Sequence, residues 1–306
     1  GATAQASATD TLAWLAAGDR GSRDLLLEIG VEEMPASACR AAIDLLPDRV
    51  ASLFAAEGVE VKAEDVDVMV SPRRIAVMIK DVPGEQAPRE IVQRGPAIEA
   101  AFDAEGKPTK ACEGFARAKG IAPADLVTRE EGGRCFVYYV TQSESRPTAG
   151  LLPDICLKIV RDMYFPKNMR WGYRDVRFSR PIRSLVALWG ETVIPFSYAG
   201  LDSGRTSMGH RWLGGPVDIA RPADYVAAMR SVAVMVDHRE REQMMWAELR
   251  RRAAEHGLEV IDPNGKMEEV LFLVEHPTVA EGRFGAQQLE LPAEVLETAM
   301  QSHQRY

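Results

Sequence analysis

The sequence predicts an α+β protein made of two lobes of mixed, mainly antiparallel sheet with packed helices. Apolar and alternating runs typical of strands occur along the 306 residues, with stretches of helical spacing between them. These elements do not alternate strictly, as the helices and strands of a parallel βαβ sheet would. A polar, punctuated segment at 143–147 marks a boundary, so we expect lobes at residues 25–147 and 148–306.

The N-terminal part begins with a segment, residues 1–24, that we interpret as a disordered tag or linker, because it is rich in small and polar residues. A buried strand is expected at 25–31, followed after Pro35 by a helix over 36–57 that is interrupted near Pro47. The remaining elements expected in this lobe are strands at 67–70 and 75–82, a long connection at 83–108 containing a short helix at 98–102, a helix at 110–119, and a hairpin with strands at 126–129 and 135–141.

The second lobe has a similar mixture of patterns. The spacing around Asp237 fits a helix N-cap, with the helix ending near residue 255. The pattern at 268–273 is compatible with either a strand or a helix. The other expected elements are helices at 151–164, 224–234 and 293–302, and strands at 184–188, 193–198 and 206–212.

Composition limits the class of protein. Hydrophobic residues make up 46% and charged residues 27%, which suits a globular protein with a real core. A net charge of −8 argues against a free-standing nucleic-acid binder but permits a local basic patch, because a field depends on where charges lie. No apolar run reaches the roughly 18–20 residues of a membrane span, and the four cysteines have no zinc-ligand or redox spacing. We therefore expect a cytoplasmic protein with reduced thiols and no membrane contact.

Short catalytic motifs are missing from the sequence. It contains no G-x-S-x-G nucleophile motif, no P-loop, no dinucleotide fingerprint and no H-E-x-x-H pair. Glu32 and Glu33 are adjacent, so on a strand they would point to opposite faces, and we interpret them as part of a solvated turn. The sequence thus predicts neither catalytic residues nor a metal site.

Five longer stretches, in order along the chain, are more specific. They are LLLEIGVEEMP at 25–35, SPRRIAV at 71–77, a group running from FPKNMRWG through RFSRPIRSLVALWG to VIPF at 165–196, GLDSGRTSMGHRWL at 200–213, and LELPAEVLETAMQSHQRY at 289–306. Together they resemble the N-terminal part of the β subunit of bacterial glycyl-tRNA synthetase. Two positions depart from the family pattern, with Ser184 in place of an aromatic residue and Trp212 in place of Phe.

The resemblance implies a non-catalytic part of a glycine–tRNA ligase. It implies assembly with the α subunit as α2β2 and binding of tRNA(Gly), in support of ATP-dependent glycylation of that tRNA. ATP and Mg²⁺ are expected at the α subunit, no cofactor is expected in this fragment, and the C-terminal tRNA-binding domains would lie beyond residue 306. Part of the fold is expected to resemble the editing-type domain of the phenylalanyl-tRNA synthetase β chain. Two other functions stay open: a stand-alone RNA-binding or assembly module, and a trans-editing hydrolase.

Basic and aromatic residues supply the candidate tRNA contacts. Arginine pairs with phosphate as a bidentate donor, and an exposed tryptophan stacks on bases. The alternatives are a buried ion-pair network for the arginines at 170–183, and a strand bend for the glycine-flanked residues at 204–211. The candidates are Arg73, Arg74, Arg170, Trp171, Arg180, Arg183, Arg205, His210 and Arg211.

Overall fold

The computed structural model describes residues 20–165, 169–170, 176–262, 264–283 and 285–300. The chain forms two compact units, and each is described by itself. The main unit contains Gly1–Glu85 and Pro147–Tyr306, and the inserted unit contains Gln86–Arg146. Both units combine helices with antiparallel strands, so the predicted α+β class is confirmed.

This division differs from the two successive lobes that the sequence predicts. The expected boundary at residue 147 is only the end of the inserted unit, and the chain then returns to the unit it left. The backbone N–H of Thr148 donates to the Gly84 carbonyl at 2.9 Å. This hydrogen bond connects the segment that leads into the inserted unit with the segment that leads out of it, and both residues belong to the main unit. Strands from before and after the insertion pair in one sheet, and such non-local pairing cannot be read from a local sequence pattern.

The main unit is built on a five-stranded sheet in the order β10-β9-β1-β3-β2. Every neighbouring pair is antiparallel, and β1 lies in the centre, with Leu27 opposite both Val77 and Ala187. Both faces of β1 are covered, which explains its continuous apolar run. The strands are β1 (Arg23–Val31), β2 (Val66–Ser71), β3 (Arg74–Val82), β9 (Ile182–Trp189) and β10 (Thr192–Val193).

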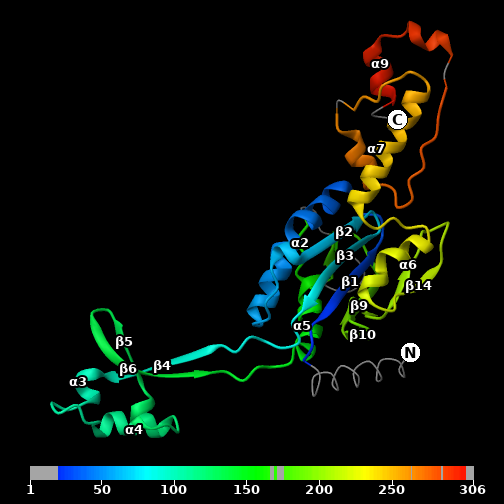
Figure 1. Ribbon diagram of the computed structural model, residues 1–306. Coiled ribbons are helices and arrows are strands. Elements are labelled where there is room, and N and C mark those ends of the chain that lie inside the picture. Colours follow the sequence, from blue (N-terminus) through cyan, green and yellow to red (C-terminus); the bar gives the residue numbers. More distant parts are fainter. Residues whose placement is uncertain (1–19, 166–168, 171–175, 263, 284, 301–306) are drawn as a thin grey trace. The chain divides into compact units, whose positions relative to one another are not determined.

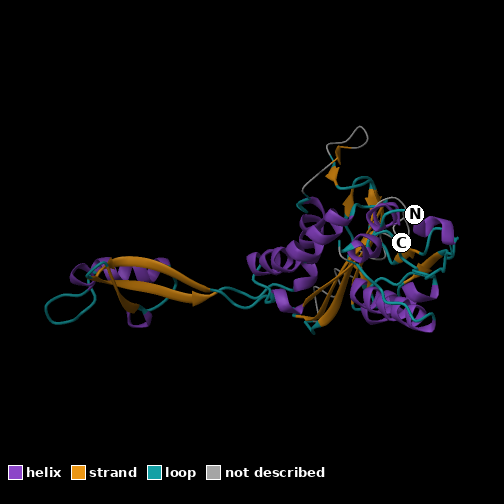
Figure 2. Cartoon of the chain, turned by 90° about the horizontal axis from the view of Figure 1, so that it is seen from above, coloured by secondary structure: helices purple, strands orange, loops and turns teal. Residues whose placement is uncertain are grey.

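Helices pack on both faces of this sheet (Figure 1). On one face, α2 (Ala36–Ala56) and α5 (Leu152–Arg161) bury Leu25 and Leu27 of β1. On the other, α6 (Tyr225–Ser231) packs over Leu26. Figure 2 shows the same sheet from above, with helices on its two sides.

The interruption expected at Pro47 is wrong, because α2 continues through it. Proline removes one backbone donor and disfavours a helix interior, but the buried stripe that includes Leu46, Val50 and Phe54 holds this helix on the sheet.

The rest of the main unit consists of short strands and helices. The Asp237 side chain accepts from the Arg239 N–H at 2.9 Å, so the predicted N-cap of α7 is confirmed, and the undecided segment at 268–273 begins in helix α8. These elements are β7 (Met169–Arg170), β8 (Arg177–Phe178), β11 (Ser197–Tyr198), β12 (Leu201–Asp202), β13 (Thr206–Met208), β14 (Pro216–Asp218), α7 (His238–Glu255), α8 (Lys266–Leu271) and α9 (Ala293–Thr298), with 3₁₀ turns at Ala63–Asp65, Thr148–Gly150, Pro222–Asp224 and Ala286–Glu290.

The inserted unit is a three-stranded antiparallel sheet in the order β4-β6-β5. Helices α3 (Ile98–Ala101) and α4 (Lys110–Ala118) pack on it around Ala101, Cys112 and Val137. The predicted hairpin is present as β5 (Val127–Glu131) and β6 (Arg134–Gln142), with left-handed glycines at its turn. The expected connection at 83–108 is partly a strand, β4 (Glu90–Ala97), whose Pro96 is tolerated because β4 is an edge strand. Among the helices described in either unit, none has the length and apolar character needed to cross a bilayer.

Candidate nucleic-acid interface

A cavity of about 360 Å³ lies where β1 ends and β3 and β9 begin. Its lining comes from four separate parts of the sequence, near residues 30, 73, 183 and 210. The cavity is called the arginine pocket here, because five of the predicted tRNA contacts line it: Arg73, Arg74, Arg183, His210 and Arg211.

Backbone hydrogen bonds fix the acidic turn that follows β1 beside this pocket. The Val31 N–H donates to the Arg73 carbonyl at 2.8 Å, and the Met34 N–H donates to the Pro72 carbonyl at 2.7 Å. On the other side, the Glu32 N–H donates to the Pro181 carbonyl at 3.0 Å. Glu32 and its neighbour Glu33 are therefore held between two arginine-containing segments.

Three surface arginines share these two carboxylates. Arg183 Nε donates to Glu32 Oε1 at 2.6 Å, and this hydrogen bond holds the pKa of Glu32 below its ordinary value although partial burial opposes it. Arg73 lies 3.9 Å from Glu32 and 3.8 Å from Glu33, and Arg211 lies 3.7 Å from Glu33. Arg183 and Arg211 are 61% and 53% exposed, and surface pairs of this kind contribute little stability, so these two arginines can exchange partners.

Arg74 has a different environment from Arg73. Its side chain is 3% exposed, and its Nε lies 2.9 Å from Glu275 Oε1 while its Nη1 lies 3.5 Å from Glu28 Oε2. Burial alone would lower the pKa of Arg74, but Glu28 and Glu275 raise it. Arg74 is thus held inside the protein, which corrects its place among the surface tRNA contacts.

The Glu28 carboxylate receives further hydrogen bonds inside the same network. Tyr225 Oη donates to Glu28 Oε2 at 2.5 Å, and Ser207 Oγ donates to Glu28 Oε1 at 2.6 Å. Burial and the adjacent Glu28 charge raise the pKa of Tyr225 well above its ordinary value, so its hydroxyl stays a donor. The network joins β1, β3, β13 and α6 beneath the pocket.

The 209–214 loop forms another wall of the pocket and is tightly built. The Gly209 N–H donates to the Gly215 carbonyl and the His210 N–H to the Val232 carbonyl, both at 2.9 Å. A Cβ at Gly214 would lie 2.1 Å from the Val232 carbonyl oxygen, so glycine is needed for close approach. The strand-bend alternative concerned Gly204 and Gly209. A Cβ at Gly209 would lie 2.5 Å from the Gly215 carbonyl oxygen, whereas a Cβ at Gly204 would meet no atom within 4 Å.

At the turn of this loop the structure exposes an aromatic residue that the sequence did not single out as a contact. Trp212 is 80% exposed, and the Arg211 guanidinium carbon lies 5.2 Å from the centre of its ring. His210 Nδ1 accepts from the Trp212 N–H at 3.3 Å, which holds the turn. The sequence signal that could have identified Trp212 as a contact is its position as an aromatic residue inside a basic, glycine-rich stretch.

The other candidates fall in different places. Arg180 borders the pocket, since its Nε donates to the Glu33 carbonyl at 3.0 Å. Arg205 does not join it, because its Nη2 donates to the Glu191 carbonyl at 2.9 Å, beyond the other end of β9. The backbone of Arg170 lies in β7 without a described side chain, and Trp171 lies outside the described residues.

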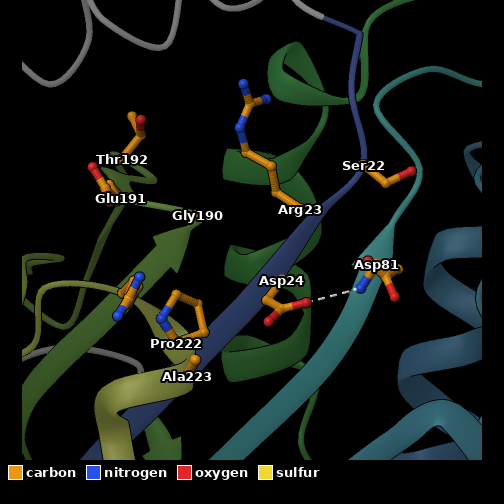
Figure 3. A pocket seen from close by; sticks show the side chains of 10 residues that line it. Ser22, Arg23, Asp24, Asp81, Gly190, Glu191, Thr192, Pro222 and Ala223 are labelled. Atoms are coloured by element: carbon orange, nitrogen blue, oxygen red, sulfur yellow. Dashed lines mark hydrogen bonds between the residues drawn. The ribbon is translucent and has the colours of Figure 1, made fainter.

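The end of β9 near Glu191 borders a separate cavity of about 510 Å³ (Figure 3). It is lined by residues from several segments, including Arg23, Asp24 and Asp81, and the Asp81 N–H donates to Asp24 Oδ1 at 3.0 Å. Acids outnumber bases in this lining, whereas arginines predominate in the lining of the arginine pocket, where Glu32 is the one acid among the described lining residues.

No metal cluster is evident in the described part of the chain. No group of three or more His, Cys, Asp or Glu side chains there is placed to hold a metal ion. The four cysteines are free, and burial raises the pKa of Cys39 and Cys156 to about 12. These two thiols therefore stay protonated at neutral pH.

Comparison with known proteins assigns the family. The family model of the glycyl-tRNA synthetase β subunit matches residues 25–306. The chain belongs to the glycyl-tRNA synthetase β-subunit family. A glycine–tRNA ligase β subunit of Desulfitobacterium hafniense (strain DSM 10664 / DCB-2) is 41% identical over 285 residues, which are 93% of this chain and 41% of that protein.

Other β subunits of glycine–tRNA ligase show similar identity. That of Moorella thermoacetica is 39% identical over 288 residues and that of Listeria monocytogenes serotype 4b (strain CLIP80459) 40% over 285, again covering 93% of this chain and 41% of each relative. The chain thus spans about 41% of the length of these β subunits. Four of the five stretches that carry the β-subunit resemblance contribute to the arginine pocket or border it: 25–35, 71–77, 177–190 and 200–213.

Proposed function

We propose that this chain acts as part of the β subunit of a glycine–tRNA ligase and holds tRNA(Gly) at the arginine pocket. In this role Arg73, Arg183 and Arg211 contact phosphates of the tRNA, and Trp212 offers a ring on which an unpaired base stacks. The attachment of glycine takes place elsewhere in the enzyme. Membership of the β-subunit family supports the enzyme assignment.

The observation that carries the tRNA contact is the convergence of predicted basic residues from distant segments on one cavity. This chain has a net charge of −8, so its overall charge does not favour binding to RNA. A local group of arginines beside an exposed tryptophan combines the two features that bind single-stranded nucleic acid: phosphate neutralisation and base stacking.

The test is the salt dependence of tRNA(Gly) binding, measured by fluorescence anisotropy between roughly 50 and 200 mM salt. Arg183→Ala and Arg211→Ala should each weaken binding and lower the slope of log K against log salt by about one, because one phosphate contact is lost. Trp212→Ala should weaken binding by roughly 1–3 kcal/mol with an unchanged slope, since stacking involves no counterion.

Arg161→Ala provides a matched control. Arg161 is about as exposed as Arg183 (51% against 61%), and each makes an ion pair of 2.6 Å, but Arg161 pairs with Asp162 at the end of α5. If Arg161→Ala and Arg183→Ala lower the affinity for tRNA(Gly) equally, tRNA does not bind at the pocket, and the loss reflects only the change in overall charge.

We also propose that the chain assembles with a glycyl-tRNA synthetase α subunit as α2β2 in the cytoplasm, and that ATP and Mg²⁺ act on that partner. The support is the name β subunit shared by the relatives. Co-elution of this chain with a purified α subunit in size exclusion with light scattering tests the assembly. If a full-length β subunit co-elutes and this chain does not, the assembly contact lies outside these residues.

A further inference from the structure

One carboxylate oxygen lies between two guanidinium groups at the rim of the arginine pocket. Glu33 Oε1 is 3.8 Å from Arg73 Nη1 and 3.7 Å from Arg211 Nη1. These distances are within reach of charge attraction but too long for hydrogen bonds. Two arginines thus converge on a position for an anion, and the carboxylate that occupies it satisfies neither of them fully.

The burial of Arg73 gives independent evidence that Glu33 does not fully satisfy the arginines. The Arg73 Nη1 atom is buried, yet within the described part of the chain it donates no hydrogen bond. Buried donors are normally paired, and one left without a hydrogen bond is costly. Since this atom faces Glu33 Oε1, an anion that came closer would satisfy it.

The backbone of Glu33 is fixed beside the pocket. Its carbonyl accepts from Arg180 Nε at 3.0 Å, and its two neighbours, Glu32 and Met34, each donate a backbone hydrogen bond to a different segment. The Glu33 side chain itself is 66% exposed, so it can swing into solvent without disturbing the core.

We propose that the space between Arg73 and Arg211 is a phosphate site, and that the Glu33 carboxylate occupies it when no phosphate is bound. A phosphate group presents at least two anionic oxygens to the two planar guanidinium groups and forms the short, charge-assisted hydrogen bonds that Glu33 does not reach. Glu33 therefore acts as a built-in competitor that weak anions do not displace. With tRNA as the source of the phosphate, this inference rests on the proposed function; with free phosphate it does not.

The experiment compares Glu33→Gln with Glu64→Gln. Both substitutions remove one negative charge from an exposed acid of the main unit (66% and 76% exposed), but Glu64 lies away from the pocket. Two probes are titrated into each protein: inorganic phosphate at constant ionic strength, followed by calorimetry, and tRNA(Gly), followed by anisotropy. Urea unfolding of each variant checks that it is folded.

We expect Glu33→Gln to bind inorganic phosphate and tRNA(Gly) about tenfold more tightly than the unsubstituted chain, because the competitor is gone and each charge-assisted hydrogen bond becomes available. Glu64→Gln should change neither affinity by more than about twofold. Adding Arg211→Ala to Glu33→Gln should abolish the gain, as a double-mutant cycle requires for coupled groups.

The outcomes separate the two proposals. Equal effects of Glu33→Gln and Glu64→Gln with both probes would overturn the phosphate site. A gain with inorganic phosphate alone supports the site and counts against tRNA as its ligand. A gain that survives the addition of Arg211→Ala would also overturn it, since the phosphate would then bind elsewhere.

Discussion

Arg73 and Arg74 are neighbours in the chain with different roles. Arg73 is 23% exposed and faces the acidic turn, whereas Arg74 is 3% exposed and belongs to a buried network with Glu28 and Glu275. The residue types predicted a basic site that includes both arginines, but the sequence could not distinguish between them. The partner that fixes Arg74, Glu275, lies 201 positions away along the chain.

The buried network leads to a prediction about stability. Glu275→Gln should lower the free energy of unfolding at neutral pH by roughly 2–3 kcal/mol, because Arg74 keeps its buried charge and loses a charged partner. Glu64→Gln, on the surface, should stay within about 0.5 kcal/mol. Urea titrations measure both, and a loss below about 0.5 kcal/mol for Glu275→Gln would contradict this role of the buried ion pair.

The same carboxylate determines the sign of a pH effect. Burial would raise the pKa of Glu275, but Arg74 holds it below the ordinary value of 4.5. The unfolded chain therefore takes up the proton first, and stability from this group is full above about pH 4.5 and is lost as pH falls through the folded-state pKa. The difference between the unsubstituted chain and Glu275→Gln should shrink only in that acidic range.

At the scale of elements, local pattern was enough where turn residues mark the ends of an apolar run or of an apolar helix face. Strands β1, β2 and β3 and helix α4 lie close to their predicted ranges, because apolar spacing and turn residues agree there. The prediction failed where packing overrides propensity, as it does for Pro47 inside α2. It also failed for β4, whose edge position permits Pro96.

The 209–214 loop gives the prediction at this scale. Gly214→Ala should destabilise the protein by about 1–3 kcal/mol and weaken tRNA(Gly) binding, because the new Cβ meets the Val232 carbonyl and displaces the turn with Trp212. Gly215→Ala is the control, since no atom lies within 4 Å of the position that its new Cβ would take. Urea unfolding and anisotropy report the two effects, and similar behaviour of both variants would show that the loop is not rigidly required.

For the whole molecule, the sequence indicated the α+β class but not how the chain is divided. The inserted unit separates β3 from α5 and β9, so no local signal tells that residues before 85 and after 147 share one core. The same folding brings Glu33, Arg73, Arg180 and Arg211 together. The sequence supplied the arginines as candidates, whereas their carboxylate partners became evident only from the three-dimensional arrangement.

Binding of tRNA on the arginine pocket would place the nucleic acid next to Trp212, and photocross-linking detects that contact. Trp212 is replaced with the photoreactive p-benzoylphenylalanine, and the protein is irradiated with tRNA(Gly). The control is the same replacement at Leu45, an exposed residue of α2 outside the pocket lining. We predict cross-linked tRNA from position 212 and little from position 45. Equal cross-linking from both positions, or none from position 212, would contradict tRNA binding at the arginine pocket.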